Sequence, residues 1–253
     1  MRPLSRLIAL GAMSALVAAP SAMAANSATA SLSPNKGGTV TQAAPVKFKV
    51  KALLPDTPSD TSGNNRLLAI QAKLPVPLLF NTLPFSQCNT VSFPTSKSCP
   101  SSTKLGTATI LADGGPSVGE ITAKATLYFG TGFTVLANVT VDKPAIINEG
   151  VVGSLRSSGT TGYGLEMYIP VPQSLSMPLQ DLYPTVKSVD ADFAPPSKKV
   201  KVGKERITVP LAGLGTCPSS KKLNFQVNAL YTDATGVTIT KNDSASTTAK
   251  CKK

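Results

Sequence analysis

The stretch VKFKVKAL, residues 46–53, decides the fold class because apolar and basic residues alternate along it. In an extended chain, its apolar residues fall on one face and its lysines on the other. A period of two is typical of a half-buried β-strand, whereas an amphipathic helix repeats its apolar residues every third or fourth position. The stretch therefore predicts a strand whose apolar face packs on a core and whose basic face meets solvent.

The same alternation recurs along the chain between glycine, proline and serine turn residues, and it predicts further strands. These are expected at 66–74, 104–111, 120–129, 133–141, 151–157, 163–171, 188–194, 205–211, 222–231 and 236–240. About ten strands with short loops are typical of a β-sandwich, immunoglobulin-like or jelly-roll-like, or of a related barrel.

The sandwich is expected to be a single domain over residues 41–253, after a flexible lead-in over residues 25–40. A split into two half-domains near residues 143–150 is the alternative. The prolines and lysines of residues 195–204 predict an exposed basic loop.

The N-terminus has the features of a cleavable secretory signal peptide, residues 1–24. Arg2 and Arg6 precede a short apolar run, and small residues then lead to a cleavage position between Ala24 and Ala25. The run is shorter than the roughly 20 residues of a membrane span, and no later stretch is long and apolar enough to serve as one. We therefore expect a secreted bacterial protein that is free outside the cell or associated with the cell wall.

Four cysteines in an exported chain predict disulfide bonds. Of the three possible pairings, Cys88 with Cys99 and Cys217 with Cys251 closes the two shortest loops. A zinc site is disfavoured because the chain has no histidine and no Cys-x-x-Cys pair. The missing Cys-x-x-Cys pair also argues against a redox couple. We expect no metal and no cofactor.

Catalytic motifs are scarce. The absence of histidine removes the commonest general base and excludes Ser-His-Asp chemistry. Ser101-x-x-Lys104 and Ser219-x-x-Lys222 match the S-x-x-K pattern of serine–lysine enzymes. Both copies follow a cysteine and precede a strand, whereas the motif belongs on a helix and needs K-T-G, which the chain lacks. These matches are interpreted as chance.

Carboxylates offer the alternative of a carbohydrate-active or other hydrolytic enzyme, because paired carboxylates hydrolyse glycosides. Asp190 and Asp192 share one strand face, and Glu166, Asp181 and Asp233 are further candidates. Solvated carboxylates on strands and loops are the simpler interpretation. We expect a protein that is not an enzyme.

The chain is basic, with a formal charge of +12. One cluster of cations provides candidates for anion binding: Lys198, Lys199, Lys201, Lys204 and Arg206. The expected partner is an anionic cell-wall polymer or another anionic surface, without specific nucleic-acid recognition. The alternative is that these lysines protect a sheet edge from aggregation.

Several segments resemble a group of uncharacterised exported bacterial β-proteins. They are LPVPLLFNTLPFSQC (74–88), CPSSTKLGTATI (99–110), YGLEMYIPVP (163–172) and GTCPSSKKLNFQVNALYTDATGVTIT (215–240), followed by Cys251. In that group an LP-x-x-L-x-x-N segment leads to a cysteine, and a late Cys-Pro hairpin ends at a terminal cysteine. The resemblance implies a secreted, disulfide-stapled β-protein without known catalytic residues. We expect a non-enzymatic binding or surface-associated protein.

Overall fold

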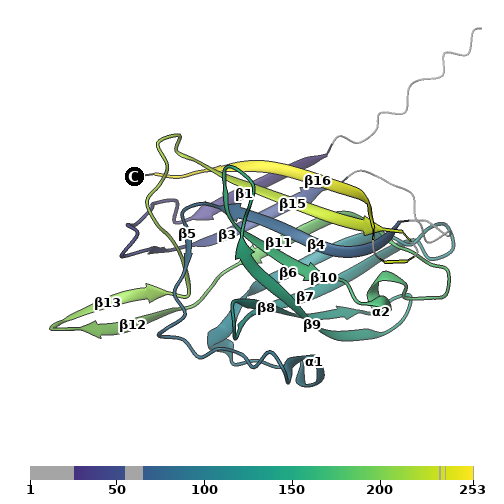
Figure 1. Cartoon of the computed structure of the whole chain (residues 1–253), viewed down its shortest axis with the longest axis horizontal. Coiled ribbons are helices and arrows are strands. Elements are labelled where there is room, and N and C mark those ends of the chain that lie inside the picture. The colour runs from purple at the N-terminus through teal and green to yellow at the C-terminus, as the bar shows by residue number, and fades with distance from the viewer. Residues whose placement is uncertain (1–25, 55–64, 234, 237, 253) are drawn as a thin grey trace, which may run out of the picture.

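The computed structural model describes residues 26–54, 65–233, 235–236 and 238–252 (Figure 1). The expected signal peptide and its cleavage site lie outside these residues. The described chain is almost entirely β-structure and contains two disulfide bonds. The predicted all-β, disulfide-stapled fold is therefore confirmed. Within the described ranges, no helix is long and apolar enough to cross a membrane.

Sixteen strands and three one-turn helices form in the described residues. The strands are β1 (Ser27–Ser33), β2 (Ala44–Pro45), β3 (Lys47–Leu53), β4 (Arg66–Pro75), β5 (Leu78–Phe80), β6 (Lys104–Asp113), β7 (Glu120–Gly130), β8 (Thr134–Val141), β9 (Ile147–Ser157), β10 (Tyr163–Pro170), β11 (Thr185–Phe193), β12 (Ser197–Val202), β13 (Glu205–Pro210), β14 (Ala212–Leu214), β15 (Lys222–Thr232) and β16 (Ile239–Lys250). The helices are α1 (Phe93–Ser96), the 3₁₀ turn η1 (Ser101–Thr103) and α2 (Gln173–Ser176).

Eleven of these strands form one antiparallel sheet in the order β1-β3-β11-β6-β7-β8-β9-β10-β4-β15-β16. The sheet curls until its two edge strands, β1 and β16, lie side by side (Figure 1). At one end of this junction the Asn26 side-chain amide donates to the Ser244 carbonyl at 2.8 Å, and at the other the Gly37 amide donates to the Lys252 carbonyl at 3.0 Å. The sheet is therefore nearly closed, and its inner face forms the core.

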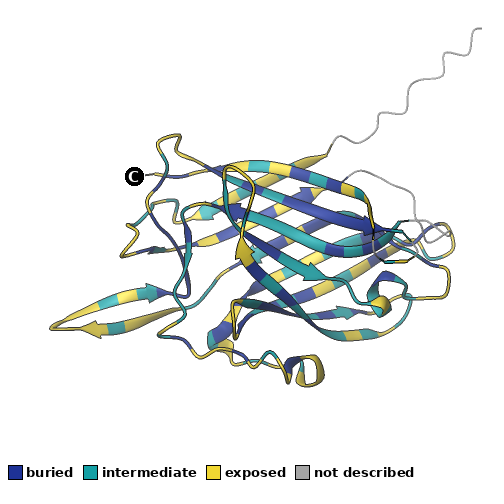
Figure 2. Cartoon of the chain, viewed as in Figure 1, coloured by how far each residue is buried: buried dark blue, intermediate teal, exposed yellow. Residues whose placement is uncertain are grey.

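The alternation in residues 46–53 behaves as predicted, since β3 buries its inward apolar residues and exposes its lysines. Figure 2 shows the same alternation of buried and exposed residues along the other strands. Successive strand residues point to opposite faces, so each strand sends every second side chain into the interior.

The short strands β2, β5 and β14 were not predicted from the sequence, and three longer strands differ from the prediction. Residues 27–33, expected in a flexible lead-in, form β1 and close the sheet. Residues 195–204, expected as a loop, supply β12, which pairs with β13 in a separate hairpin. The last strand is not 236–240 but β16, which runs from Ile239 to Lys250. Its sequence ITKNDSASTTAK has few large apolar residues, so its inward positions carry no hydrophobic signal.

The alternative domain boundary at residues 143–150 falls at the turn between β8 and β9. These two strands pair from Thr134 opposite Ser154 to Val141 opposite Ile147. Strands from before and after the turn are neighbours in the same eleven-stranded sheet.

One part of the interior is filled by aromatic side chains. Phe48 stacks on Phe193 with ring centroids 4.6 Å apart, and Phe225 lies 5.6 Å from Phe48. Tyr231 reaches across the interior from β15 to β11, where its hydroxyl accepts a hydrogen bond from the Val186 amide at 2.9 Å. This contact lies at a register irregularity of β11, between Val186 and Ser188. Burial raises the pKa of Tyr231 well above its usual range, and the nearby carboxylate of β16 adds to the rise.

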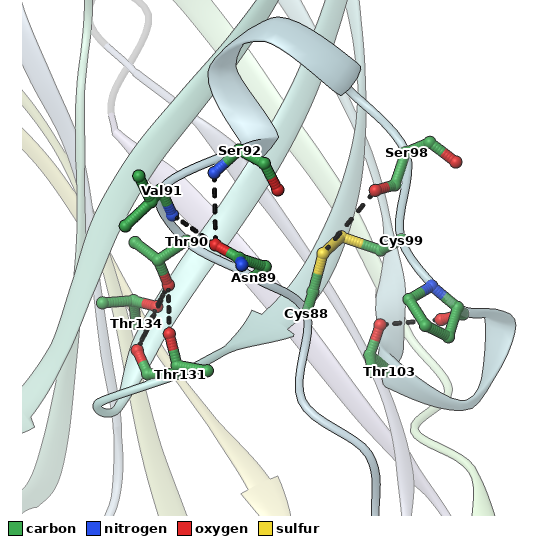
Figure 3. The surroundings of a disulfide bond; sticks show 11 residues. Cys88, Asn89, Thr90, Val91, Ser92, Ser98, Cys99, Thr103, Thr131 and Thr134 are labelled. Carbon is green, nitrogen blue, oxygen red and sulfur yellow. Dashed lines mark hydrogen bonds between the residues drawn. A yellow bond between two sulfur atoms is a disulfide. The ribbon is translucent and has the colours of Figure 1, made fainter.

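The disulfide bonds join Cys88 to Cys99 and Cys217 to Cys251, the pairing expected from the sequence. Figure 3 shows the first of them closing the loop that carries α1. Within this loop the Asn89 side-chain oxygen accepts hydrogen bonds from the amides of Val91 and Ser92.

The loop that carries α1 lies on the outer face of the sheet. Its Phe93 is fully buried and packs in a small cluster with Leu136 of β8. Gly150 permits this approach, since a Cβ atom there would lie 2.8 Å from the Cα atom of Pro94. The first disulfide therefore supports the wall of the sheet from outside.

Candidate functional site

A cavity of about 130 Å³ lies on the inner face of strands β6 to β11. Its lining is almost entirely apolar, and small side chains create much of the space. Six alanines face it: Ala108, Ala112, Ala123, Ala125, Ala137 and Ala191. In a close-packed core, such positions carry larger side chains that meet across the interior.

The lining of the cavity extends along the strands. Four successive inward positions of β7 line it, from Ile121 through Ala123 and Ala125 to Leu127. Since a strand rises about 3.4 Å per residue, this lining follows β7 for about 20 Å. A lining that extends this far along a strand can accommodate an elongated ligand.

Several inward-facing residues of this region are only half-buried. Ile70, Ile110 and Ile169 line the cavity, yet each retains intermediate exposure. These side chains present exposed apolar surface at the cavity. An engineered apolar cavity of comparable size, about 150 Å³, stays dry and binds benzene.

One end of the cavity is covered by α2 and its flanking prolines. Leu175 of α2 contributes to the lining, together with Pro178 and Pro184 of the following segment. In Figure 1, α2 lies at the end of the sheet where β10 finishes and β11 begins. This cover lies between β10 and β11 in the chain.

Two side-chain hydrogen bonds hold α2 in place. The Ser174 hydroxyl donates to the Glu149 carboxylate of β9 at 2.9 Å. The Arg66 guanidinium of β4 donates through Nε to the hydroxyl of Ser176, which is fully buried, at 3.1 Å. These bonds tie α2 to the two strands that flank β10 in the sheet.

The cavity was not predicted from the sequence. A signal is present in EITAKATLYF (120–129), where alternate positions hold isoleucine, two alanines and leucine. Alternation identifies these as inward positions, and the alanines indicate unfilled volume if the facing residues are small as well. Those facing residues come from other strands, and their identity depends on the sheet order.

The predicted basic cluster lies on the β12–β13 hairpin, where the register separates its members. Lys199 is opposite Thr208 and Lys201 is opposite Arg206, so these cations share one face. Lys198 lies on the other face, and its ammonium donates to the Pro84 carbonyl at 2.8 Å. Lys198 therefore anchors the base of the hairpin, and only the remaining cations stay as anion-binding candidates.

The candidate carboxylates are spread over the fold. Asp192 pairs with Lys49 at 2.8 Å on the outer face, and this contact raises the pKa of Lys49. The Glu166 carboxylate, nearly buried, accepts a hydrogen bond from Arg156 Nε at 2.8 Å.

The other acidic candidates lie in different surroundings. Asp190 is opposite Lys51 in the sheet register. Asp181 occupies a left-handed backbone position with a φ of 58°, in the segment that follows α2. Asp233 accepts a hydrogen bond from the Thr235 amide at 3.1 Å. In the described part of the chain, no group of three histidine, cysteine or acidic residues is placed to hold a metal ion.

Comparisons of the chain with models of protein families, with curated proteins and with solved structures gave no match.

Proposed function

We propose that the protein is an exported, non-enzymatic binding protein that holds the apolar chain of a small molecule inside its near-closed sheet. The observation that carries this proposal is the cavity of about 130 Å³ with its alanine lining. Export is supported by the two disulfide bonds, which persist in oxidising compartments. The resemblance to exported bacterial β-proteins points in the same direction.

The lining determines the class of ligand. A polar group without a hydrogen-bond partner is costly to bury, and this wall offers almost no partners. The part of the ligand inside the sheet is therefore hydrocarbon. A polar end would lie beside α2, where Arg66, Glu149 and the α2 serines bring polar groups to the end of the cavity.

Affinity should then depend on chain length. Each buried methylene contributes about 0.8 kcal/mol, or roughly a fourfold gain in affinity. We expect this gain for each added carbon of a straight-chain alkanol until the chain fills the cavity. Beyond that length the affinity should level off, because further carbons remain in water.

The test is a displacement titration with the neutral fluorescent probe N-phenylnaphthylamine and a series of straight-chain alkanols. The filling variant Ala125→Leu/Ala137→Leu should lose both probe and alkanol binding, because both side chains point into the cavity. The matched control is Thr122→Leu, which adds a leucine to the exposed face of the same strand as Ala125. The control should bind as the unmodified protein does.

Two results would contradict the proposal. One is the absence of saturable probe binding by the unmodified protein. The other is equal binding by the filling variant and the control, which would place the probe on the surface.

A further inference from the structure

The β12–β13 hairpin stands out from the near-closed sheet (Figure 1). Most of its residues are exposed, as Figure 2 shows. It follows the end of β11 at Phe193, whereas α2 and the covered end of the cavity lie before the start of β11 at Thr185. The hairpin and α2 are thus at opposite ends of β11, and an activity of the hairpin does not depend on the proposed function.

One face of the hairpin carries four apolar side chains, Val200, Val202, Ile207 and Val209, with Lys198 near its base and Glu205 opposite Val202 near the tip. Val200 and Ile207 are opposite each other on this face, and Val202 near the tip is 56% exposed. These side chains line a hollow together with the segment of residues 80–84. In that segment Leu83 is 99% exposed, so the apolar surface continues from the hairpin onto the adjoining loop.

The other face is basic and lacks a counter-charge. Lys201 lies directly opposite Arg206, and like charges at such a position destabilise a hairpin. Among the described residues, neither forms an ion pair. Lys199 shares their face, and Lys204 occupies the turn at the tip. The arrangement is unfavourable in isolation and becomes favourable beside an anionic surface.

We propose that this hairpin docks the protein on an anionic lipid bilayer. Val202 and Leu83 enter the interfacial region, and the three cations of the basic face, Lys199, Lys201 and Arg206, bind lipid phosphates. A two-stranded ribbon is thin, so both of its faces meet the interface when it approaches tip first. Long basic side chains bury their methylene stems in apolar surroundings while their charges stay among the headgroups.

Charge and hydropathy together select this partner. A second copy of the chain could cover the apolar side chains, but it would leave the cations of the basic face without a counter-charge. A soluble anionic polymer would satisfy the cations but would leave the exposed Val202 and Leu83 in water. An anionic bilayer satisfies both faces of the hairpin.

The first test is co-sedimentation with vesicles of phosphatidylglycerol and phosphatidylcholine, compared with vesicles of phosphatidylcholine alone. A cation near an anionic membrane contributes about a fivefold gain in affinity, so Lys199→Gln/Lys201→Gln/Arg206→Gln should weaken binding on the order of 100-fold. The matched control removes three exposed lysines from the main sheet, as Lys47→Gln/Lys51→Gln/Lys124→Gln. The control should bind within about threefold of the unmodified protein, because these lysines lie outside the docking surface.

The second test uses the absence of tryptophan from the chain. The variant Val202→Trp places a single reporter near the hairpin tip, and its emission should shift to the blue on anionic vesicles. Ile146→Trp is the matched control, since Ile146 is 90% exposed in the turn between β8 and β9. Its emission should not change. This readout does not depend on the stability of the triple variant.

Soluble polyglutamate separates the two anionic partners. Docking on lipid predicts that Leu83→Ser/Val202→Ser weakens vesicle binding at least about threefold and leaves polyglutamate binding unchanged, since each buried apolar side chain contributes separately from charge. The proposal is wrong if anionic vesicles are not bound, if both triple variants weaken binding equally, or if the reporter near the tip stays in water. It is also wrong if the serine variant binds vesicles as the unmodified protein does, which would favour a polymer.

A lipid chain taken into the cavity would also retain the protein on vesicles. The filling variant Ala125→Leu/Ala137→Leu distinguishes the two sites, and docking by the hairpin predicts that it binds vesicles normally. If this variant loses vesicle binding while both triple glutamine variants bind normally, the interaction belongs to the cavity and the docking proposal is wrong.

Discussion

Two parts of the same interior differ in how they are filled. Where β3 faces β15, aromatic side chains meet, with Phe48 and Phe225 5.6 Å apart. On the inner face of β6 to β11, alanines line much of the wall and a cavity remains. Both parts are built by the same alternation of inward and outward residues. The difference therefore reflects side-chain size and not a change in backbone pattern.

The two parts therefore contribute differently to the stability of the sheet. In the aromatic part, closely packed side chains stabilise the fold. In the alanine-lined part, the side chains around the open space make fewer van der Waals contacts. Tyr231 spans the two, since it belongs to β15 and its hydroxyl contacts the Val186 amide of β11, a strand that lines the cavity. The contrast predicts that equal substitutions will have unequal effects in the two parts.

The largest difference is expected for a matched pair of leucine truncations. Leu223→Ala removes a buried side chain from β15 and should lower the free energy of unfolding by about 3–4 kcal/mol. Leu127→Ala changes an equally buried side chain that already borders the cavity, and it should cost about 2 kcal/mol, because fewer contacts are lost. Urea unfolding measures both values. Equal costs would mean that the two parts are packed alike.

A smaller effect is expected for Tyr231→Phe. The variant leaves the buried Val186 amide without its hydrogen-bond partner, which should cost about 1–3 kcal/mol at neutral pH. The half-buried Tyr163 offers a control, and Tyr163→Phe should change stability by less than about 0.5 kcal/mol. A cost below that of the control would mean that the contact across the interior is not stabilising.

The same tyrosine predicts a dependence on alkaline pH. Its pKa is raised in the folded protein, so its contribution is present below the pKa of an unfolded tyrosine, about 10, and is lost as the pH rises further. The free energy of unfolding should fall above that pH more steeply in the unmodified protein than in Tyr231→Phe. Parallel pH profiles of the two proteins would contradict the raised pKa.

The smallest effect on stability is expected for the filling variant Ala125→Leu/Ala137→Leu. Because both side chains enter existing space, the free energy of unfolding should stay within about 1 kcal/mol of the unmodified protein or rise. Thermal and urea unfolding provide the measurement. A loss of more than about 2 kcal/mol would indicate overpacking, and hence an interior without room for a ligand.

Local pattern predicted much of the fold. The strand over residues 46–53 and the positions of most others follow from period-two alternation. The disulfide pairing follows from the shortest loops. Both depend on residues that are near one another in the chain.

The remaining features depend on residues that are distant in the chain. The closure of the sheet joins β1 to β16, and each of these strands has a single large apolar residue, Leu32 in β1 and Ile239 in β16. The division of the basic cluster required the hairpin register and the contact of Lys198 with Pro84. The cavity required knowledge of which small side chains face each other. Pairwise contacts of this kind are absent from a linear pattern.

A crystal structure with a long-chain alkanol that carries bromine at its far end would locate the bound ligand. Anomalous scattering locates the bromine without reference to the rest of the density. If the cavity binds the ligand, we expect a bromine site inside the sheet beside Ala125 and Ala137, with the hydroxyl end toward α2. A bromine site only against the apolar face of the β12–β13 hairpin, or no site at all at saturating alkanol, would contradict this expectation.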